Sequence, residues 1–503
     1  MSIRRQSIIS SFIVYIGLVL GLLNTYLYAK GFSEAQYGLI GTFQAFATIM
    51  LSFSNVGLTY YIGKFFPYYN DNLPPEKNDM ITLSLVTSIT AFAFVMISGF
   101  VFKGFVIQKY NTHSPEVVYY YSWLFPYGFG LSIYSILEAF AWQLRKPVVT
   151  SFLKEILWRL FATVLIVLTL THVIKDFDLF IKIYAFTYIG IALALFIYLV
   201  ATRKMHLTFS ISRVTKKFFK KIIRVTFFVW SGSLVLNIAQ VFDTLVIGAV
   251  VSSGMKYVGI YTLAQNMSSL VFAPQRAIVA ASISALSQAW KDKDYGRINR
   301  IYQRSSINQL VFSIAIFSLI WLNFNDGVVT LHLKQGYLDA RIVFLYIGLT
   351  KIIDMGTGVN SQIIGTSIYW KVDFLSGIFL MMITIPLNYF LTKYLNNVGQ
   401  GALGPAIANL IAITIYNAIR YLFLLRKFNM QPFNTKTVYT ILLGAVCYAI
   451  CYFLFNHYQG FGWIVLRSTV FVALYATGVL YLDLSPDVLP VWETLKKRLR
   501  LKK

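Results

Sequence analysis

The chain has 503 residues, of which 57% are hydrophobic, 17% are aromatic and only 13% are charged. This composition excludes a soluble globular protein, because such a protein has no interior large enough for so many apolar side chains. The formal net charge of +25 does not indicate a nucleic-acid-binding protein, since no basic patch lies on a recognisable soluble domain.

Apolar runs of about 20 residues recur along the whole chain, as expected for helices that cross a bilayer. We therefore predict an all-α, polytopic membrane protein with about fourteen transmembrane helices. The predicted spans are 8–29, 39–65, 80–102, 117–141, 148–172, 180–201, 224–251, 257–286, 306–324, 342–368, 372–391, 401–425, 438–455 and 463–482. The first run is longer than the apolar core of a signal peptide, so we expect it to be retained as a span.

The order of the spans predicts two lobes of equal size, followed by two further helices. The predicted divisions are an N-terminal lobe 1–201, a basic cytoplasmic linker 202–223, a C-terminal lobe 224–425, two more spans within 426–483, and a basic tail 484–503. We expect the linker and residues 290–304 to be either amphipathic segments along the inner membrane surface or solvated loops.

The distribution of lysine and arginine predicts the orientation of the spans. If the amino terminus is cytoplasmic, the inner segments carry about three times as many basic residues as the outer segments. Both termini are then cytoplasmic, and the protein is expected in the cytoplasmic (inner) membrane. Most of the net charge thus reflects topology and attraction to anionic headgroups.

The sequence contains no pattern typical of an enzyme active site, such as GxSxG, HExxH or a Walker loop. Its two cysteines, Cys447 and Cys451, are four residues apart, which fits neither a metal site nor a redox motif, so we interpret them as small core residues. We expect a secondary transporter or facilitator that is not an enzyme and has no cofactor and no metal ion.

Charged and amide side chains inside the spans are the candidate site residues. Such groups usually face the interior of a helix bundle or a water-filled cavity. Glu155 and Arg159 are four residues apart and can pair on one helix face. Lys351 and Asp354, three residues apart, can pair in the same way. The candidate substrate-binding residues are Arg276, Arg159, Lys351, Asp243, Asp354 and Asn55. The alternative is that the paired groups only hold helices together.

Arg276 has no obvious charged partner three or four residues away, and it closely follows Pro274 in the same span. A guanidinium group binds the oxygens of a pyrophosphate in pairs, so cationic residues inside spans suit an anionic, lipid-linked substrate. The alternative role for Arg276 is to neutralise a carboxylate such as Asp243.

A short stretch of the chain occurs in two similar copies. Residues 237–264 predict a transmembrane hairpin with an external turn at 252–254, and residues 255–260 resemble residues 34–39. Weak internal symmetry of this kind is typical of duplicated transporter halves. We therefore expect Tyr37 and Tyr257 at equivalent places in two lobes related by a pseudo-two-fold axis along the membrane normal.

Several stretches resemble one family of membrane proteins. DTLVIG at 243–248, followed by YVGIYTLA at 257–264, resembles the seventh-span hairpin of polysaccharide-export flippases. NNVGQGALGPAIA at 396–408 resembles the start of their twelfth span, although Pro405 stands where the family often has a small residue. Residues 55–58 and 34–38 are similar to the end of their second span and to their first loop. The family is that of the Wzx-type polysaccharide and oligosaccharide flippases, in the superfamily that also holds multidrug extruders and the lipid II flippase.

The resemblance implies two six-helix lobes around a central cavity, with two extra helices. It implies alternating access that moves an undecaprenyl-pyrophosphate-linked oligosaccharide to the outer leaflet for O-antigen, lipopolysaccharide or capsule synthesis. Arg276 and Arg159 match the family's cationic cavity by location. The implied partners are membrane lipids, a polysaccharide polymerase and glycosyltransferases, with a Na⁺ or H⁺ gradient as the candidate driving force.

Three other functions remain open at this point. A multidrug or cation antiporter of the same fold is favoured by Asp243 but opposed by the cations Arg276 and Lys351. A lipid II flippase differs only in its substrate. A membrane polymerase or ligase would need a sizeable external loop with catalytic residues, and the external segments of this chain are short.

Overall fold

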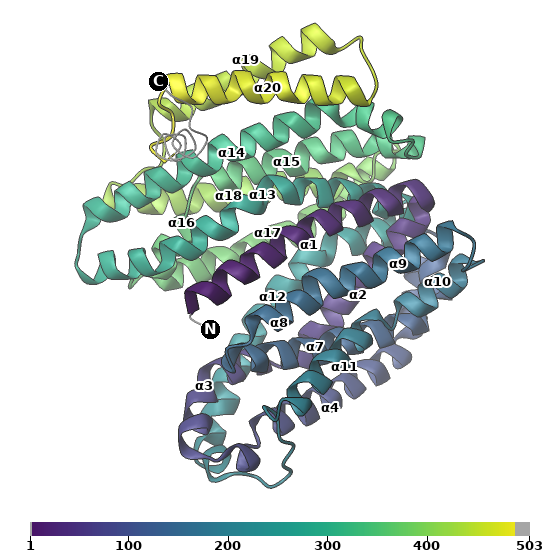
Figure 1. The fold of residues 1–503 in the computed structure, drawn as a ribbon, viewed down its shortest axis with the longest axis vertical. Coiled ribbons are helices and arrows are strands. Elements are labelled where there is room, and N and C mark those ends of the chain that lie inside the picture. The colour runs from purple at the N-terminus through teal and green to yellow at the C-terminus, as the bar shows by residue number, and fades with distance from the viewer. Residues whose placement is uncertain (1–2, 488–503) are drawn as a thin grey trace. The chain divides into compact units, whose positions relative to one another are not determined.

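The structure is a computed structural model that describes residues 3–487, apart from the side chains of residues 3–8, 11, 276, 277 and 280. All regular secondary structure in this range is helical (Figure 1). Within it, 11 helical segments are long and apolar enough to cross a membrane. The predicted all-α, polytopic membrane fold class is therefore confirmed.

The other three predicted spans are not among these segments. Residues 148–172 fold as a helix with a π-helical segment, residues 342–368 fold as an interrupted helix, and residues 257–286 lie within one very long helix whose side chains are only partly described. A total of about fourteen spans therefore stays a prediction.

The chain divides into two compact units, Met1–Gly259 and Ile260–Lys503, with the division inside one helix. The predicted lobe boundaries at 201 and 224 stay a prediction. The helices of the first unit are α1 (Ile3–Gly31), α2 (Glu34–Asn55), α3 (Leu58–Asn72), η1 (Pro75–Lys77), α4 (Met80–Val101), α5 (Lys103–Tyr110), α6 (Pro115–Tyr119), η2 (Tyr121–Trp123), α7 (Leu124–Gln143), α8 (Pro147–Ser151), η3 (Phe152–Leu157), α9 (Trp158–Leu170), α10 (Phe177–Tyr184), α11 (Thr187–Ala201), α12 (Arg213–Val250) and the start of α13 (Gly254–Lys291).

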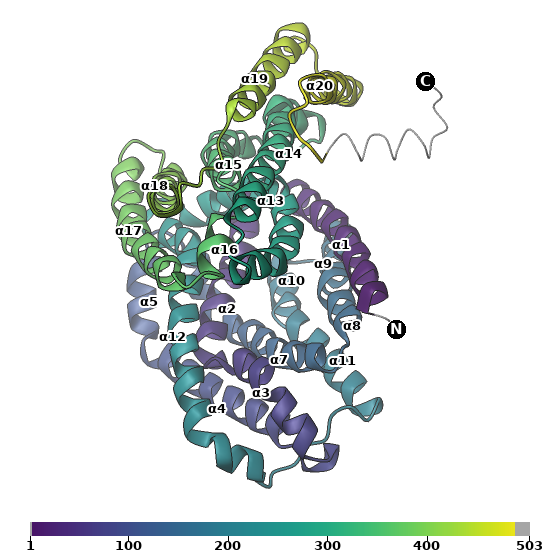
Figure 2. The same ribbon diagram turned by 90° about the vertical axis from the view of Figure 1, so that its left-hand side faces the viewer.

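Helix α7 is central to the first unit, where it packs against α2, α3, α4 and α11. Helix α1 lies along the segment from α8 to α9, as both ribbon views show (Figures 1 and 2). A core between α3, α7 and α11 contains large buried side chains such as Tyr61, Phe65 and Tyr134. This core fixes α3 against α7, which is where the pocket described below is found.

The second unit is built on α14, α15 and α18, and α19 and α20 pack together against α14 (Figure 2). Cys447 and Cys451 are free and buried in the core beneath α19 and α20, as their spacing predicts. The helices of this unit are the remainder of α13, then α14 (Tyr295–Thr330), η4 (Gln335–Asp339), α15 (Ala340–Gly356), α16 (Asn360–Gly365), α17 (Trp370–Asn396), α18 (Leu403–Phe428), α19 (Thr435–Phe455) and α20 (Phe461–Tyr481).

Two predicted spans are broken by residues with a left-handed backbone. Between α2 and α3, Val56 and Gly57 have φ angles of 46° and 75°. Between α15 and α16, Gly358 has a φ angle of 64°, and a Cβ atom there would lie 2.8 Å from the hydroxyl of Ser305. Interrupted helices expose backbone groups, and in transporters they often mark binding sites.

The two helices and the turn of the predicted hairpin are present, since α12 ends at Val250 and α13 begins at Gly254, while the external position of the turn stays a prediction. Each of these helices has 38 residues and is therefore about 57 Å long, which exceeds the roughly 30 Å hydrocarbon core. Helix α12 starts inside the predicted linker because the side chain of Ser212 accepts a hydrogen bond from the backbone N–H of Thr215, as in a typical N-cap.

Candidate functional site

The first unit holds an ion pair between Glu155 and Arg159, as their spacing predicts. The Arg159 Nη2 and Glu155 Oε2 atoms are 2.8 Å apart. Glu155 belongs to η3, a six-residue π-helix that joins α8 to α9. A π-helical segment inside an α-helix is rare and frequently occurs at functional sites, because it shifts the direction of the side chains that follow it.

Two glycines of α1 make room for this ion pair. A Cβ atom at Gly17 would lie 2.7 Å from the Cβ of Glu155, and one at Gly21 would lie 2.6 Å from Nη1 of Arg159. Arg159 also donates a hydrogen bond to the carbonyl oxygen of Gly17. Helix α1 therefore approaches the pair closely enough to hold the guanidinium group in one orientation.

A second ion pair lies nearby, between Lys154 of η3 and Glu138 of α7. Its Nζ and Oε2 atoms are 3.5 Å apart, and the two side chains are 44% and 13% exposed, respectively. The side chain of Glu138 is thus mostly buried, while that of Lys154 is partly exposed. Lys154 is therefore the more available of the two groups for a ligand.

A cavity of about 480 Å³ lies between α3 and α7 and reaches Glu138. This volume is within the range of about 300–1,000 Å³ that is typical of small-molecule sites. Its wall includes Tyr60, Lys64, Ser135, Glu138, Trp142 and Gln143.

Asn55, a predicted site residue, is the last residue of α2 and bonds to one residue of α3 and one of α7. Its Oδ1 atom accepts a hydrogen bond from the backbone N–H of Thr59 at 3.3 Å, and its Nδ2 donates to Ser135 at 3.5 Å. Asn55 thus links the end of α2 to the first turn of α3 and contacts a residue of the cavity wall. Its role in substrate binding stays a prediction.

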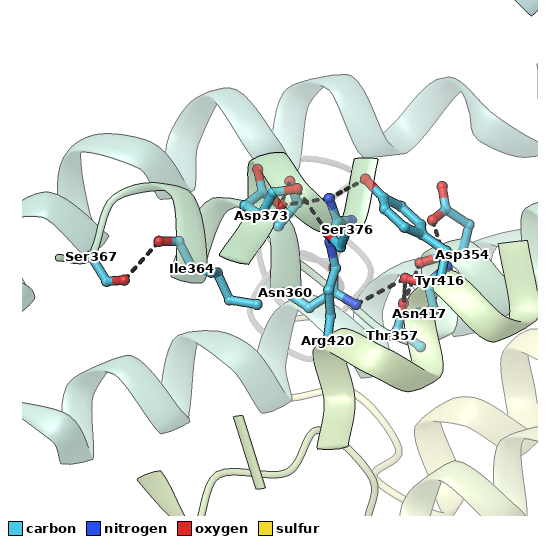
Figure 3. Close-up of polar contacts among 11 residues, drawn as sticks. Asp354, Thr357, Asn360, Ile364, Ser367, Asp373, Ser376, Tyr416, Asn417 and Arg420 are labelled. Carbon is cyan, nitrogen blue, oxygen red and sulfur yellow. Dashed lines mark hydrogen bonds and ion pairs between the residues drawn. The ribbon is translucent and has the colours of Figure 1, made fainter. Parts of the chain in front are cut away.

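The second unit holds a separate polar network at the break between α15 and α16 (Figure 3). Asn417 of α18 donates to Asp354 at 3.0 Å and accepts hydrogen bonds from Thr357 at 2.8 Å and from Asn360 at 2.9 Å. One amide therefore joins the end of α15, the interruption and the start of α16.

Arg420 extends this network one turn further along α18. Its Nη2 atom lies 2.5 Å from Oδ1 of Asp373 in α17, its Nε donates to Ser376 at 3.3 Å, and it also donates to the hydroxyl of Tyr416. Figure 3 shows these side chains converging from α17 and α18. Arg420 is buried, so its charge is compensated by the Asp373 carboxylate.

Lys351 and Asp354 take other partners, although their spacing allows them to pair with each other. Asp354 is bonded to Asn417, while the Nζ atom of Lys351 lies 4.8 Å from the centre of the Phe272 ring. The cation–π contact leaves the ammonium group of Lys351 without direct neutralisation by its neighbour on α15.

Two predicted site residues remain, Asp243 and Arg276. Asp243 is buried in α12. Arg276 belongs to α13, but its side chain lies outside the described residues, so its predicted contact with the substrate stays a prediction. The structure brings Glu155 and Arg159 together in the first unit, and it places Asp354 in a network of the second unit.

The sequence prediction missed Asn417 and Tyr416 as members of the second network. A signal was available, because Tyr416, Asn417 and Arg420 are spaced by three and four residues and so share one face of a helix. The prediction also missed a buried ion pair between Asp326 and Arg467. Helix α14 continues to Thr330, which places Asp326 beyond the end of the predicted span but inside the helix.

Comparison with known proteins identifies the family. The sequence matches the model of a family described as "Polysaccharide biosynthesis protein" over residues 3–290, which is more than half of the chain. No curated protein sequence matches the chain.

The fold is similar to that of known transporters. For the lipid II flippase MurJ in an inward closed conformation, the TM-score is 0.70 at 17% identity, covering 95% of this chain and 99% of that one. For an inward-facing MATE family multidrug resistance transporter of the MOP superfamily, the TM-score is 0.61 at 16% identity, covering 84% of this chain and 99% of that one. For the Vibrio cholerae MATE transporter VcmN, the TM-score is 0.52 at 13% identity, covering 84% of this chain and 96% of that one. At these identities the likeness shows a common fold. Together with the match to the family model, it leads to the conclusion that this chain belongs to the polysaccharide biosynthesis protein family and has the fold of MOP-superfamily transporters.

Proposed function

We propose that the protein is a flippase that moves an undecaprenyl-pyrophosphate-linked oligosaccharide across the cytoplasmic membrane by alternating access. The observation that carries this proposal is the match to the polysaccharide biosynthesis family over residues 3–290. The product would serve the synthesis of a surface polysaccharide such as an O-antigen of lipopolysaccharide or a capsule. A polysaccharide polymerase and glycosyltransferases are the partners that such a pathway requires.

The charged groups of the first unit support an anionic substrate. Lys64 lines the cavity between α3 and α7, and Lys154 pairs with Glu138 of its wall. Arg159 pairs with Glu155 on the segment that also carries Lys154. The cations exceed the carboxylates, and both carboxylates already have a cationic partner. A pyrophosphate group is therefore a better match for this region than a cationic drug.

Two further candidate functions each have one supporting observation. The likeness to the lipid II flippase MurJ makes lipid II the second candidate substrate. The likeness to MATE transporters keeps a multidrug or cation antiporter as the third. We retain Arg276, Arg159, Lys351, Asp243, Asp354 and Asn55 as proposed substrate-path residues, with a Na⁺ or H⁺ gradient as the proposed driving force.

The proposed function is tested with purified protein in liposomes. The substrate is an undecaprenyl-pyrophosphate oligosaccharide with a fluorescent label on the glycan, and a membrane-impermeant reductant bleaches the label only in the outer leaflet. We expect the protein to make the inner-leaflet pool bleachable when a Na⁺ or H⁺ gradient is imposed, because it exchanges the lipid between leaflets. Protein-free liposomes and liposomes with labelled phospholipid are the controls. Export of a cationic dye without movement of the glycolipid would contradict the proposal and favour the antiporter.

The proposed orientation, with both termini cytoplasmic, makes a separate prediction. The native cysteines, Cys447 and Cys451, are buried, so single added cysteines report access to water. Val398→Cys, in the turn after α17, is expected to react with an impermeant maleimide added to spheroplasts. Phe209→Cys, in the segment before α12, is expected to react only after the membrane is permeabilised. Both native side chains are well exposed, so the reverse pattern of labelling would mean that the orientation is inverted.

A further inference from the structure

The cavity between α3 and α7 has two aromatic walls. Tyr60 and Trp142 both line it and both keep a large exposed surface. The indole N–H of Trp142 donates to the hydroxyl of Thr150 at 2.9 Å, and the hydroxyl of Tyr60 accepts from Nζ of Lys64 at 3.2 Å. These bonds hold the two rings in place. The Nζ atom of Lys64 lies 5.4 Å from the centre of the Tyr60 ring and covers part of one face, whereas the exposed ring of Trp142 favours a ligand with a flat apolar side.

The polar groups of the cavity suit a neutral sugar that lies beside an anionic group, because the wall also carries the cation Lys64. Glu138 is already paired with Lys154, so the cavity offers no free carboxylate that would attract a cation. The side chain of Gln143 makes no hydrogen bond to another residue in the described part of the chain, although it lies in the wall. An amide of this kind can both donate to and accept from a hydroxyl group. The cavity thus combines aromatic side chains and a few neutral polar groups with the ammonium group of Lys64, which suits the pyrophosphate next to a sugar.

We propose that this cavity binds a pyranose ring of the lipid-linked glycan, next to the pyrophosphate, before transport. A pyranose has C–H groups on one face that pack against an aromatic ring and hydroxyl groups at its edge that bond to amides. Under the proposed orientation, Trp142 lies at the cytoplasmic end of α7 and Lys64 lies halfway along α3, so the cavity is on the side from which the substrate would enter. This inference rests on the proposed function and adds the recognition of the sugar at a defined place.

The first experiment measures binding to the purified full-length protein. The probes are short-chain prenyl pyrophosphates that carry glucose, galactose or N-acetylglucosamine, and the same prenyl pyrophosphate without a sugar. We expect at least one sugar-bearing probe to bind on the order of tenfold more tightly than the sugar-free probe, since an aromatic contact and a hydrogen bond are added. The ratio of the two affinities isolates the contribution of the sugar.

Two variants locate that contribution in the cavity. Trp142→Leu removes one aromatic wall, and Gly63→Leu fills the space, because the nearest atom to a Cβ at Gly63 is Nε2 of Gln143 at 3.9 Å. Both are expected to reduce the affinity ratio to about one, with a much smaller effect on the affinity for the sugar-free probe. Trp142→Phe keeps an aromatic face and is expected to retain most of the sugar preference.

Matched controls come from α17 in the second unit. Trp370 is 47% exposed, compared with 54% for Trp142, and Gly377 has no atom within 4 Å of its Cβ position. Trp370→Leu and Gly377→Leu are therefore expected to leave the sugar preference intact. Melting temperatures identify any variant that loses affinity because it unfolds. If Trp142→Leu is such a variant, the sugar preference of Trp142→Phe shows whether the aromatic ring binds the sugar.

The outcomes separate this inference from the proposed function. If no sugar increases the affinity, or if Trp142→Leu and Gly63→Leu keep the preference while glycolipid is still flipped, the cavity does not bind the sugar and the inference fails alone. If phosphatidylglycerol in the detergent micelle abolishes the preference, the cavity is a phospholipid-headgroup site and the inference also fails. If neither prenyl pyrophosphate binding nor glycolipid flipping occurs, the proposed function itself fails.

Discussion

Replacing Gly38 by alanine is expected to disrupt the protein, although the change adds a single methyl group. A Cβ atom at Gly38, in the second turn of α2, would lie 1.9 Å from the carbonyl oxygen of Met255 and 2.8 Å from the backbone nitrogen of Gly259. Both atoms belong to the backbone of α13, so no side-chain rotation relieves the overlap. Overpacking typically costs about 1–3 kcal/mol, and we expect Gly38→Ala to reach or exceed about 3 kcal/mol.

The same reasoning applies to the other side of the helix crossing. A Cβ atom at Gly259 would lie 2.0 Å from the carbonyl oxygen of Glu34, so Gly259→Ala is expected to have a comparable effect. The measurements are the midpoint of thermal unfolding of the purified protein and the rate of glycolipid flipping. Gly327→Ala in α14 is the control, because nothing lies within 4 Å of its Cβ position. Wild-type stability and transport in both Gly38→Ala and Gly259→Ala would show that α2 and α13 do not cross this closely.

This crossing gives a structural meaning to the repeat that the sequence predicts. Gly38 meets Met255, and Gly259 meets Glu34, so each segment presents the same pair of positions to the other. A local two-fold relation produces such a reciprocal contact. This relation makes Gly38 equivalent to Gly259, and it therefore makes Tyr37 equivalent to Val258. The predicted equivalence of Tyr37 and Tyr257 differs from it by one residue.

Local parts of the site were predictable from the sequence, while parts that depend on distant segments were not. Glu155 and Arg159 pair because both lie on one helical segment, and residue spacing decides such contacts. Asp373 and Arg420 come from different helices and are 47 residues apart, so no spacing rule links them. The break in the span predicted at 342–368 was also missed, since Gly358 is held in its left-handed conformation by the approach of Ser305 from α14.

Removing Arg467 is expected to destabilise the second unit strongly. Its Nη2 lies 3.1 Å from Oδ2 of Asp326, and both side chains are only 6% exposed. The guanidinium group also donates to the carbonyl oxygens of Leu322 at 3.2 Å and Tyr458 at 2.9 Å. Arg467→Met leaves the Asp326 carboxylate buried without a cation, and loss of one partner from a buried pair costs about 3–5 kcal/mol.

A double-mutant cycle separates the ion pair from the packing of the arginine side chain. Asp326→Asn combined with Arg467→Met removes both charges and is expected to recover much of the stability lost in Arg467→Met, because no uncompensated charge remains. The exposed pair of Lys436 and Asp483, whose side chains are 39% and 57% exposed, is the matched control, and Lys436→Met is expected to cost no more than about 1 kcal/mol. Thermal unfolding in detergent measures Asp326→Asn, Arg467→Met, the double variant and Lys436→Met. Equal and small losses for Arg467→Met and Lys436→Met would mean that water or lipid headgroups solvate Asp326, so that the contact between α14 and α20 does not depend on this ion pair.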